Sequence, residues 1–222
     1  MKRRHRLSGA LDSRRSTLPE GKEFGVLINF VALQATRVPY HREWFEGQAA
    51  HLAKWQAQLF LGHPQLFDRF LEEMRGQGKE VPDFITREGM LEFLEDESRY
   101  TIEIPREASI QHMLQMAEGL LPVLSERSWS LAVAQDARHD FICSDRPVML
   151  VPTEPDPPPF LGFGMRETEV IMPLNRKMAV VGHYGSDGEV FNVDQIGVGT
   201  FNQRTLHLAE RFVYSARESF PV

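Results

Sequence analysis

FICSDRPVMLV, from Phe141 to Val151, is the stretch that decides the fold. It contains two short apolar runs separated by a polar corner at Ser144–Pro147, which indicates two strands joined at a turn. Two further apolar runs follow at Glu169–Leu174 and Lys177–Tyr184. The second of these is apolar on both faces, as expected of a central strand. We therefore predict a β-sheet in this part of the chain.

One more strand is predicted directly before this stretch. Apolar and polar residues alternate over Trp129–Val133, which is typical of a half-buried strand. The segment Asp136–Asp140 has the composition of a turn and leads into the strand that starts at Phe141. We expect these two strands to form an antiparallel hairpin.

The first half of the chain has helical periodicity. Apolar residues at positions 24, 27, 28, 31 and 35 fall on one face of a helix. Pro39 restricts Val38 to extended backbone, so we predict that this helix ends near Arg37. A second helix is predicted over residues 40–60, with four large side chains on its buried side: Trp44, Leu52, Trp55 and Leu59.

Shorter signals complete the order of elements. Further helices are predicted over 65–74, from the Thr86 cap through Leu94, along the apolar stripe of 110–124, and from the Asp194 cap to about Glu210. A closing strand is predicted over 211–215. Because helices precede strands, we predict an α+β fold with an N-terminal helical half packed on a C-terminal, largely antiparallel β-sheet, plus a late helix. We expect a disordered basic tail over 1–17 and a single domain over 18–222, helical over 18–127 and sheet over 128–222.

Composition limits the classes of protein to consider. The 222 residues carry a net charge of −6 and one cysteine, Cys143, so an intrachain disulfide is excluded and a cytoplasmic location is expected. No apolar run is long enough for a membrane span. Residues 1–16 hold six of the 25 basic and one of the 31 acidic residues, which leaves an acidic body. Such a body repels nucleic acid, so we expect nucleic-acid binding only weakly, through the tail.

Sequence motifs that carry chemistry are mostly absent. We find no zinc-binding spacing, no phosphate-loop lysine motif and no nucleophile elbow, and no cofactor is indicated. Gly197 and Gly199 resemble the start of a dinucleotide fingerprint. However, Asn202 stands where that motif needs its third glycine, and no second strand bearing an acid follows.

Four polar residues at predicted element ends are candidate ligand-binding residues. Ser144 and Asp145 lie at the corner between two strands, where a carboxylate is placed at a sheet edge. Asn202 lies on a helix behind two glycines that permit close backbone approach. Arg37 ends the first helix and can bind a carboxylate or phosphate. The alternative for each residue is a structural role. Asp145 would then stabilise its own turn, and Arg37 would form an exposed ion pair.

Several strings together resemble one mostly bacterial family, the domain of unknown function 4238. They are WSLAVAQDARHD before the Phe141 strand, FICSDRPVMLV itself, VIMPLNRKMAVVG, FNQRTLHLAERFVYS and, earlier, FVALQATRVPYHRE. The resemblance covers roughly residues 20–215 and implies no activity, because the family is uncharacterised. Members usually begin with a His-x-x-Val-Pro segment that this sequence lacks. If that segment supplies functional groups, we expect this chain to be a fragment or an inactive relative. The matching positions are Arg37, Pro39, Ser144, Asp145, Pro147, Pro173, Leu174, Lys177 and Asn202.

Three functions remain open from the sequence. The first is binding of a small polar or anionic ligand by Arg37, Ser144, Asp145 and Asn202 in one pocket. The second is a metal-dependent hydrolase acting on phosphodiesters or nucleic acid with Asp145 as metal ligand or base, although a single carboxylate identifies no metal site. The third is a protein-interaction module in which the helical half presents Trp44 and Trp55 to a partner. An exposed apolar patch well above about several hundred Å² would favour this last reading, and full burial of both tryptophans would count against it.

Overall fold

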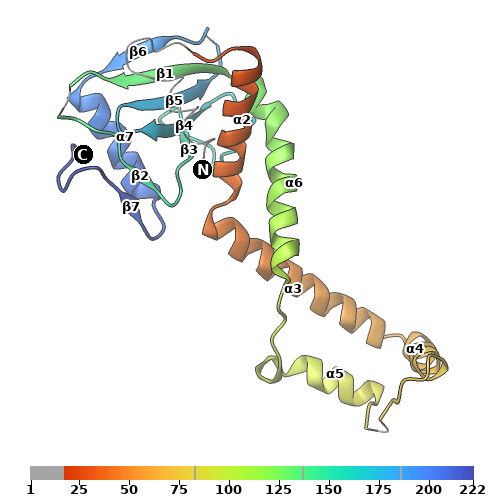
Figure 1. The fold of residues 1–222 in the computed structure, drawn as a ribbon. Helices are drawn as coiled ribbons and strands as arrows, with labels where there is room; N and C mark the ends of the chain where they lie inside the picture. Colours follow the sequence, from red (N-terminus) through yellow and green to blue (C-terminus); the bar gives the residue numbers. More distant parts are fainter. Residues whose placement is uncertain (1–17, 83, 137, 186) are drawn as a thin grey trace. The chain divides into compact units, whose positions relative to one another are not determined.

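The structure of the chain is a computed structural model that describes residues 18–82, 84–136, 138–185 and 187–222 (Figure 1). The predicted basic tail of 1–17 lies outside the described residues. The described part of the chain divides into two compact units. Among the described residues, those of 18–39 and 112–222 form the sheet unit, and those of 40–111 form the helical unit. The predicted single domain over 18–222 stays a prediction.

A five-stranded sheet forms the centre of the sheet unit, with the strand order β3-β4-β5-β1-β6. Every neighbouring pair is antiparallel except β1 and β6, which run parallel. The prediction of an α+β fold with a largely antiparallel sheet and a late helix is therefore confirmed. The strands are β1 (Ser128–Ala134), β3 (Met149–Pro152), β4 (Thr168–Asn175), β5 (Met178–His183) and β6 (Val190–Val193).

The FICSDRPVMLV stretch contributes to two different sheets. Its second half is β3, which pairs with β4, whereas its first half is β2 (Cys143–Ser144), which pairs with β7 (Val213–Tyr214) in a separate two-stranded sheet. The predicted hairpin between Trp129–Val133 and the Phe141 strand is therefore wrong. The Phe141 N–H donates instead to the Arg176 carbonyl, and the Ile142 N–H donates to the Asn202 side chain. These backbone donors are consequently not available to β1.

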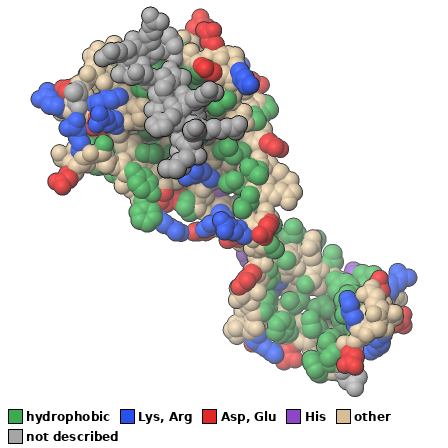
Figure 2. Space-filling view, in the orientation of Figure 1, with side chains coloured by type: hydrophobic (Ala, Val, Ile, Leu, Met, Phe, Trp, Pro, Cys, Tyr) green, Lys and Arg blue, Asp and Glu red, His purple; other side chains and the backbone are tan. Residues whose placement is uncertain are grey.

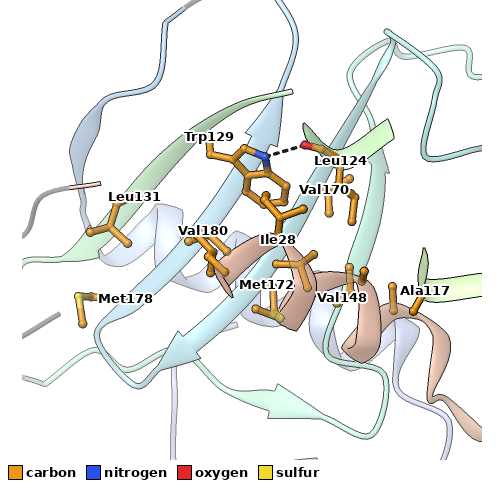
Figure 3. Close-up of a cluster of buried hydrophobic side chains, with 14 residues drawn as sticks. Ile28, Ala117, Leu124, Trp129, Leu131, Val148, Val170, Met172, Met178 and Val180 are labelled. Carbon is orange, nitrogen blue, oxygen red and sulfur yellow. Dashed lines mark hydrogen bonds between the residues drawn. The ribbon is translucent and has the colours of Figure 1, made fainter. Parts of the chain in front are cut away.

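Helices cover both faces of the central sheet (Figure 1). Helix α2 (Gly21–Thr36) and the later part of α6 (Arg106–Ser125) pack on one face, and α7 (Gln195–Leu208) packs on the other. Alternate strand residues point to the two faces, so Leu131 joins the first core cluster and Ala132 joins the second. In the first cluster, Nε1 of Trp129 donates to the Leu124 carbonyl at 2.9 Å (Figure 3).

The helical unit contains α3 (Pro39–Leu61) from Tyr40 onward, α4 (Pro64–Gly76), α5 (Arg87–Glu95), the short 3₁₀ helix η1 (Glu97–Arg99) and the start of α6. Its buried hydrophobic cluster, within the described residues, consists of Leu61, Phe67 and Leu94. The ion pair between Lys54 and Glu97 connects α3 to η1.

The prediction for the buried side of α3 is wrong. Trp44, Leu52, Trp55 and Leu59 are each more than half exposed, at 51–58%. The helix has a second set of contacts roughly on its opposite side, where Leu61 joins the core cluster and Glu46 accepts from the Ser109 hydroxyl at 3.0 Å. Because α3 carries apolar residues on both sides, periodicity alone did not identify the packed one.

Candidate functional site

The Asp145 carboxylate connects the strand corner to the segment that follows α7. It accepts the backbone N–H groups of Glu210, Arg211 and Phe212 at 3.1, 2.8 and 3.2 Å. The Asp145 N–H in turn donates to the Phe212 carbonyl at 3.1 Å. Desolvation favours the neutral acid, but the N–H donors outweigh it and hold the pKa of Asp145 below its ordinary value. This carboxylate is therefore ionised and already bound to donors of its own chain.

Ser144 closes the turn next to Asp145. The side chain is buried, and its Oγ donates to the Arg146 carbonyl at 2.9 Å and accepts the Arg146 N–H at 3.2 Å. Both contacts are local to the corner. The hydroxyl thus fixes the turn that places Asp145 opposite the 210–212 segment.

Asn202 is fully buried on α7 and joins three segments. Its Oδ1 accepts the Ile142 N–H at 3.0 Å, and its Nδ2 donates to the carbonyls of Asp140 and Pro221 at 3.0 and 2.8 Å. The side chain therefore holds the entry to β2 and the C-terminal segment against α7. The amide has used both of its N–H donors and its oxygen in these contacts.

Arg37 lies at the C-terminal end of α2 and is exposed. Burial raises the pKa of the Cys143 thiol, and the positive charge of Arg37 opposes that rise. The end of α2 is consequently near the start of the corner. Ser144 and Asp145 follow Cys143 directly, so Arg37 belongs to the same neighbourhood.

The four predicted ligand residues line neither of two cavities in the described part of the chain. One cavity of about 310 Å³ lies beside α7 and is lined by Gln195, Ile196, Gly199, Thr200, Gln203, Pro221 and Val222. Another, of about 640 Å³, lies at residues 75–82 of the helical unit. The ligand site at Arg37, Ser144, Asp145 and Asn202 stays a prediction.

A charged network that the sequence did not reveal lies next to Asn202. The Asp140 carboxylate is 1% exposed and forms ion pairs with Lys177 at 2.6 Å and Arg217 at 2.8 Å. Nζ of Lys177 also donates to the carbonyls of Asp136 and His139. Desolvation favours neutral Asp140, but the two cations outweigh it and lower its pKa. Lys177 stands out through the family resemblance, whereas nothing in the spacing identifies Asp140.

Arg127 forms a second structural centre that lacks a sequence signal. Its buried guanidinium donates to the carbonyls of Phe163, Thr168, Gly182 and Met165 and to the Thr168 hydroxyl. It also lies 4.4 Å from the ring centroid of Tyr184. Desolvation lowers its pKa. The residue ties the segment between β3 and β4, at Phe163 and Met165, to β4 and β5.

Close packing explains the two glycines at the start of α7. A Cβ at Gly197 would lie 2.4 Å from Cγ1 of Val193, and one at Gly199 would lie 3.4 Å from the backbone of Val222. Only glycine fits the first position without moving its neighbour. The Gly-x-Gly pair therefore permits α7 to approach β6 and the C-terminal segment closely.

The described residues contain no group of three or more His, Cys, Asp or Glu side chains arranged to hold a metal ion. In the same part of the chain, no helix combines the length and the hydropathy that crossing a membrane requires. The hydrolase reading stays a prediction for which the described residues supply no metal-binding cluster.

Apolar side chains are exposed on one side of α3. This exposed face consists of Tyr40, Trp44, Gly47, Gln48, His51, Leu52, Trp55, Gln58 and Leu59. Trp44 and Trp55 are 52% and 58% exposed. Figure 2 shows hydrophobic side chains gathered on the visible surface of the helical unit. The face contains no Asp, Glu, Lys or Arg, which distinguishes it from an ordinary solvated helix surface.

A family model described as protein of unknown function (DUF4238) matches residues 10–219. This match confirms the resemblance inferred from the strand-corner and Pro-Leu-x-x-Lys strings. No curated protein and no solved structure matches the chain. The comparisons therefore give a family and no activity.

Proposed function

Because the chain belongs to the DUF4238 family, whose function is unknown, we propose a function from its own geometry: protein interaction through the exposed face of α3. One observation carries the proposal. Trp44 and Trp55, the largest side chains of the helix, are both more than half exposed on the same face. Tryptophan is among the residues that contribute most to binding at protein interfaces.

The energetics favour covering this face. Burial of apolar surface gains roughly 25 cal/mol per Å², and soluble monomers rarely leave large contiguous apolar patches in water. Within the described part of the helical unit only Leu61, Phe67 and Leu94 are buried hydrophobic residues. A core of this size contributes little stability to a unit of about seventy residues. A protein partner on the exposed face of α3 would supply the missing apolar burial.

Site-specific photo-crosslinking tests the proposal. Leu52, on the exposed face, is replaced by benzoylphenylalanine in the full chain, and the matched control carries the same group at Phe160, which is 84% exposed in the sheet unit. We expect protein adducts, identified by mass spectrometry, from position 52 but not from position 160. The adduct should disappear when Trp44→Ser and Trp55→Ser are added. Absence of any protein adduct at position 52 would overturn the proposal.

A small-ligand site at the strand corner is the second candidate. It is favoured by the charge of Arg37 acting on Cys143, beside Ser144 and Asp145. Arg37 is the one cation of the predicted set and would bind an anionic group, while the bound Asp145 and Asn202 would position the backbone around it. Titration with inorganic phosphate and with citrate, followed by amide chemical shifts, tests this. We expect saturable shifts at the corner that Arg37→Ala abolishes and Arg42→Ala preserves. Linear, non-saturating shifts would contradict it.

A further inference from the structure

We propose that the partner of the exposed face of α3 is a second copy of this chain, with the two α3 helices packed antiparallel about a two-fold axis at the Ala49–Ala50 peptide. This inference rests on the proposed function, because it requires that the face docks a protein. It adds the identity and the register of the partner. The evidence is the arrangement of residues along the face.

The large residues of the face are placed symmetrically about the Ala49–Ala50 peptide. Trp44 lies five residues before Ala49, and Trp55 lies five residues after Ala50. Tyr40 lies nine residues before Ala49, and Leu59 lies nine residues after Ala50. In an antiparallel pair related by a two-fold axis, such mirrored positions meet at the same height along the helices. Each Trp44 would therefore meet Trp55 of the second copy, and each Tyr40 would meet Leu59.

Gly47 and Leu52 mark the two edges of the face. Gly47 is two residues before Ala49 and Leu52 is two residues after Ala50. At about 100° per residue they lie about 140° apart around the helix, so they flank the two-fold axis on opposite sides. A Cβ at Gly47 would have nothing within 4 Å, so this edge of the face is unobstructed. The contact between the copies is therefore formed by the residues between these two edges.

The polar residues of the face also match. Gln48 directly precedes Ala49 and His51 directly follows Ala50, so they meet across the two-fold axis. An amide both donates and accepts, so Gln48 can hydrogen-bond His51 in either protonation state. A polar pair at the centre of an apolar helix interface fixes register.

All nine residues of the exposed face also lie on a single side of the helix. At about 100° per residue they span an arc of roughly 140°, and each mirrored pair is placed evenly about the centre of that arc. Antiparallel helix pairs are built from layers in which two such offset positions interdigitate. A face that is complementary to itself is the requirement for a two-fold dimer, the commonest symmetric assembly.

Sedimentation of the purified full chain tests the assembly. At micromolar concentration we expect a particle of twice the 25.5 kDa chain mass. The double variant Trp44→Glu and Trp55→Glu should sediment as a monomer, with self-association weakened at least 100-fold. Phe160→Glu, at an exposed aromatic residue outside the helical unit, should remain dimeric. A monomeric unmodified chain, or a dimer that survives the double variant, would overturn the proposal.

Two variants keep the test independent of folding. Gln48→Glu with His51→Glu places four like charges at the centre of the pair, on positions that are exposed in each chain, so it should weaken the dimer at least tenfold without lowering the thermal midpoint of the monomer. Tyr40→Cys with Leu59→Cys, in a Cys143→Ser background, should join two copies covalently on oxidation. The single variant Leu59→Cys should not, because the two copies of Leu59 would lie about 28 Å apart at a rise of about 1.5 Å per residue. Preferential crosslinking of the single variant Leu59→Cys would overturn the antiparallel register. A monomeric chain that photo-crosslinks to a different protein overturns the second copy but leaves the proposed function intact.

Discussion

Asp140 Oδ1 lies 2.6 Å from Nζ of Lys177, and this pair joins the turn after β1 to the turn between β4 and β5. Arg217 binds the other oxygen of the same carboxylate at 2.8 Å. The carboxylate is nearly inaccessible to water, at 1% exposure, so its charge is balanced by these two cations. The network thus joins three separate segments of the chain through one buried carboxylate.

Asp140→Asn should lower the free energy of unfolding by about 2–4 kcal/mol. The loss arises because Lys177 and Arg217 keep their charges without a counterion, and it stays below the cost for a fully buried pair because both cations are partly exposed. Urea denaturation measures it. Arg138→Ala, which removes an exposed pair with Asp136, is the control and should leave the midpoint unchanged. Equal stability of Asp140→Asn and the unmodified chain would contradict a structural role for the network.

The stability of the sheet unit should also fall in acid because of Asp140. Its pKa is lowered in the folded chain by Lys177 and Arg217, which outweigh desolvation, whereas an unfolded aspartate has a pKa of about 3.9. The unfolded state therefore binds the proton more readily. The stabilisation is present above about pH 4 and is lost as the pH falls through the folded pKa. The urea midpoints at about pH 6 and about pH 3 should differ less for Asp140→Asn than for the unmodified chain. If the midpoints of both proteins fall equally with pH, Asp140 is not a cause of the acid destabilisation.

Gly182→Ala should destabilise the sheet unit by about 1–3 kcal/mol. A Cβ at this position would lie 2.9 Å from Cζ2 of Trp129, and the indole cannot shift freely because its Nε1 is bonded to the Leu124 carbonyl. Near-ultraviolet circular dichroism should report the displaced indole, and urea denaturation should report the energy. Gly25→Ala in α2 is the matched control, since a Cβ there meets nothing within 4 Å and alanine favours the helix by about 0.5–1 kcal/mol. A loss in the control equal to that of Gly182→Ala would argue against the steric explanation.

Local chemistry made the element boundaries predictable from the sequence. Pro39 ends α2 at Thr36, one residue before the predicted position. The two predicted helix caps, Thr86 at the start of α5 and Asp194 at the start of α7, also form. The Thr86 hydroxyl accepts the Gly89 N–H, and the Asp194 carboxylate accepts the Gly197 N–H. Each of these outcomes depends on residues within a few positions of one another. That is the range over which sequence patterns carry direct information.

Long-range contacts were not predictable in this way. The Ile142 N–H is taken by Asn202 and Asp140 is paired with Lys177, and neither partnership leaves a mark in the local spacing. Asp145 was expected at a strand corner, yet its three donors come from residues 210–212. Periodicity predicts the wrong side of α3 as buried, because the helix carries apolar residues on both sides. Tertiary packing decides between the two sides.

Asn202→Leu should lower the free energy of unfolding by about 2–4 kcal/mol. Leucine has a similar volume but leaves the Ile142 N–H and the carbonyls of Asp140 and Pro221 without their bonds in a fully buried place. Urea denaturation measures the loss, and proteolysis of the C-terminal segment should accelerate because its bond at Pro221 is gone. Gln203→Leu, one position along α7 at an exposed site, should change neither. If Asn202→Leu unfolds at the urea concentration of the unmodified chain, the amide does not hold β2 and the C-terminal segment together.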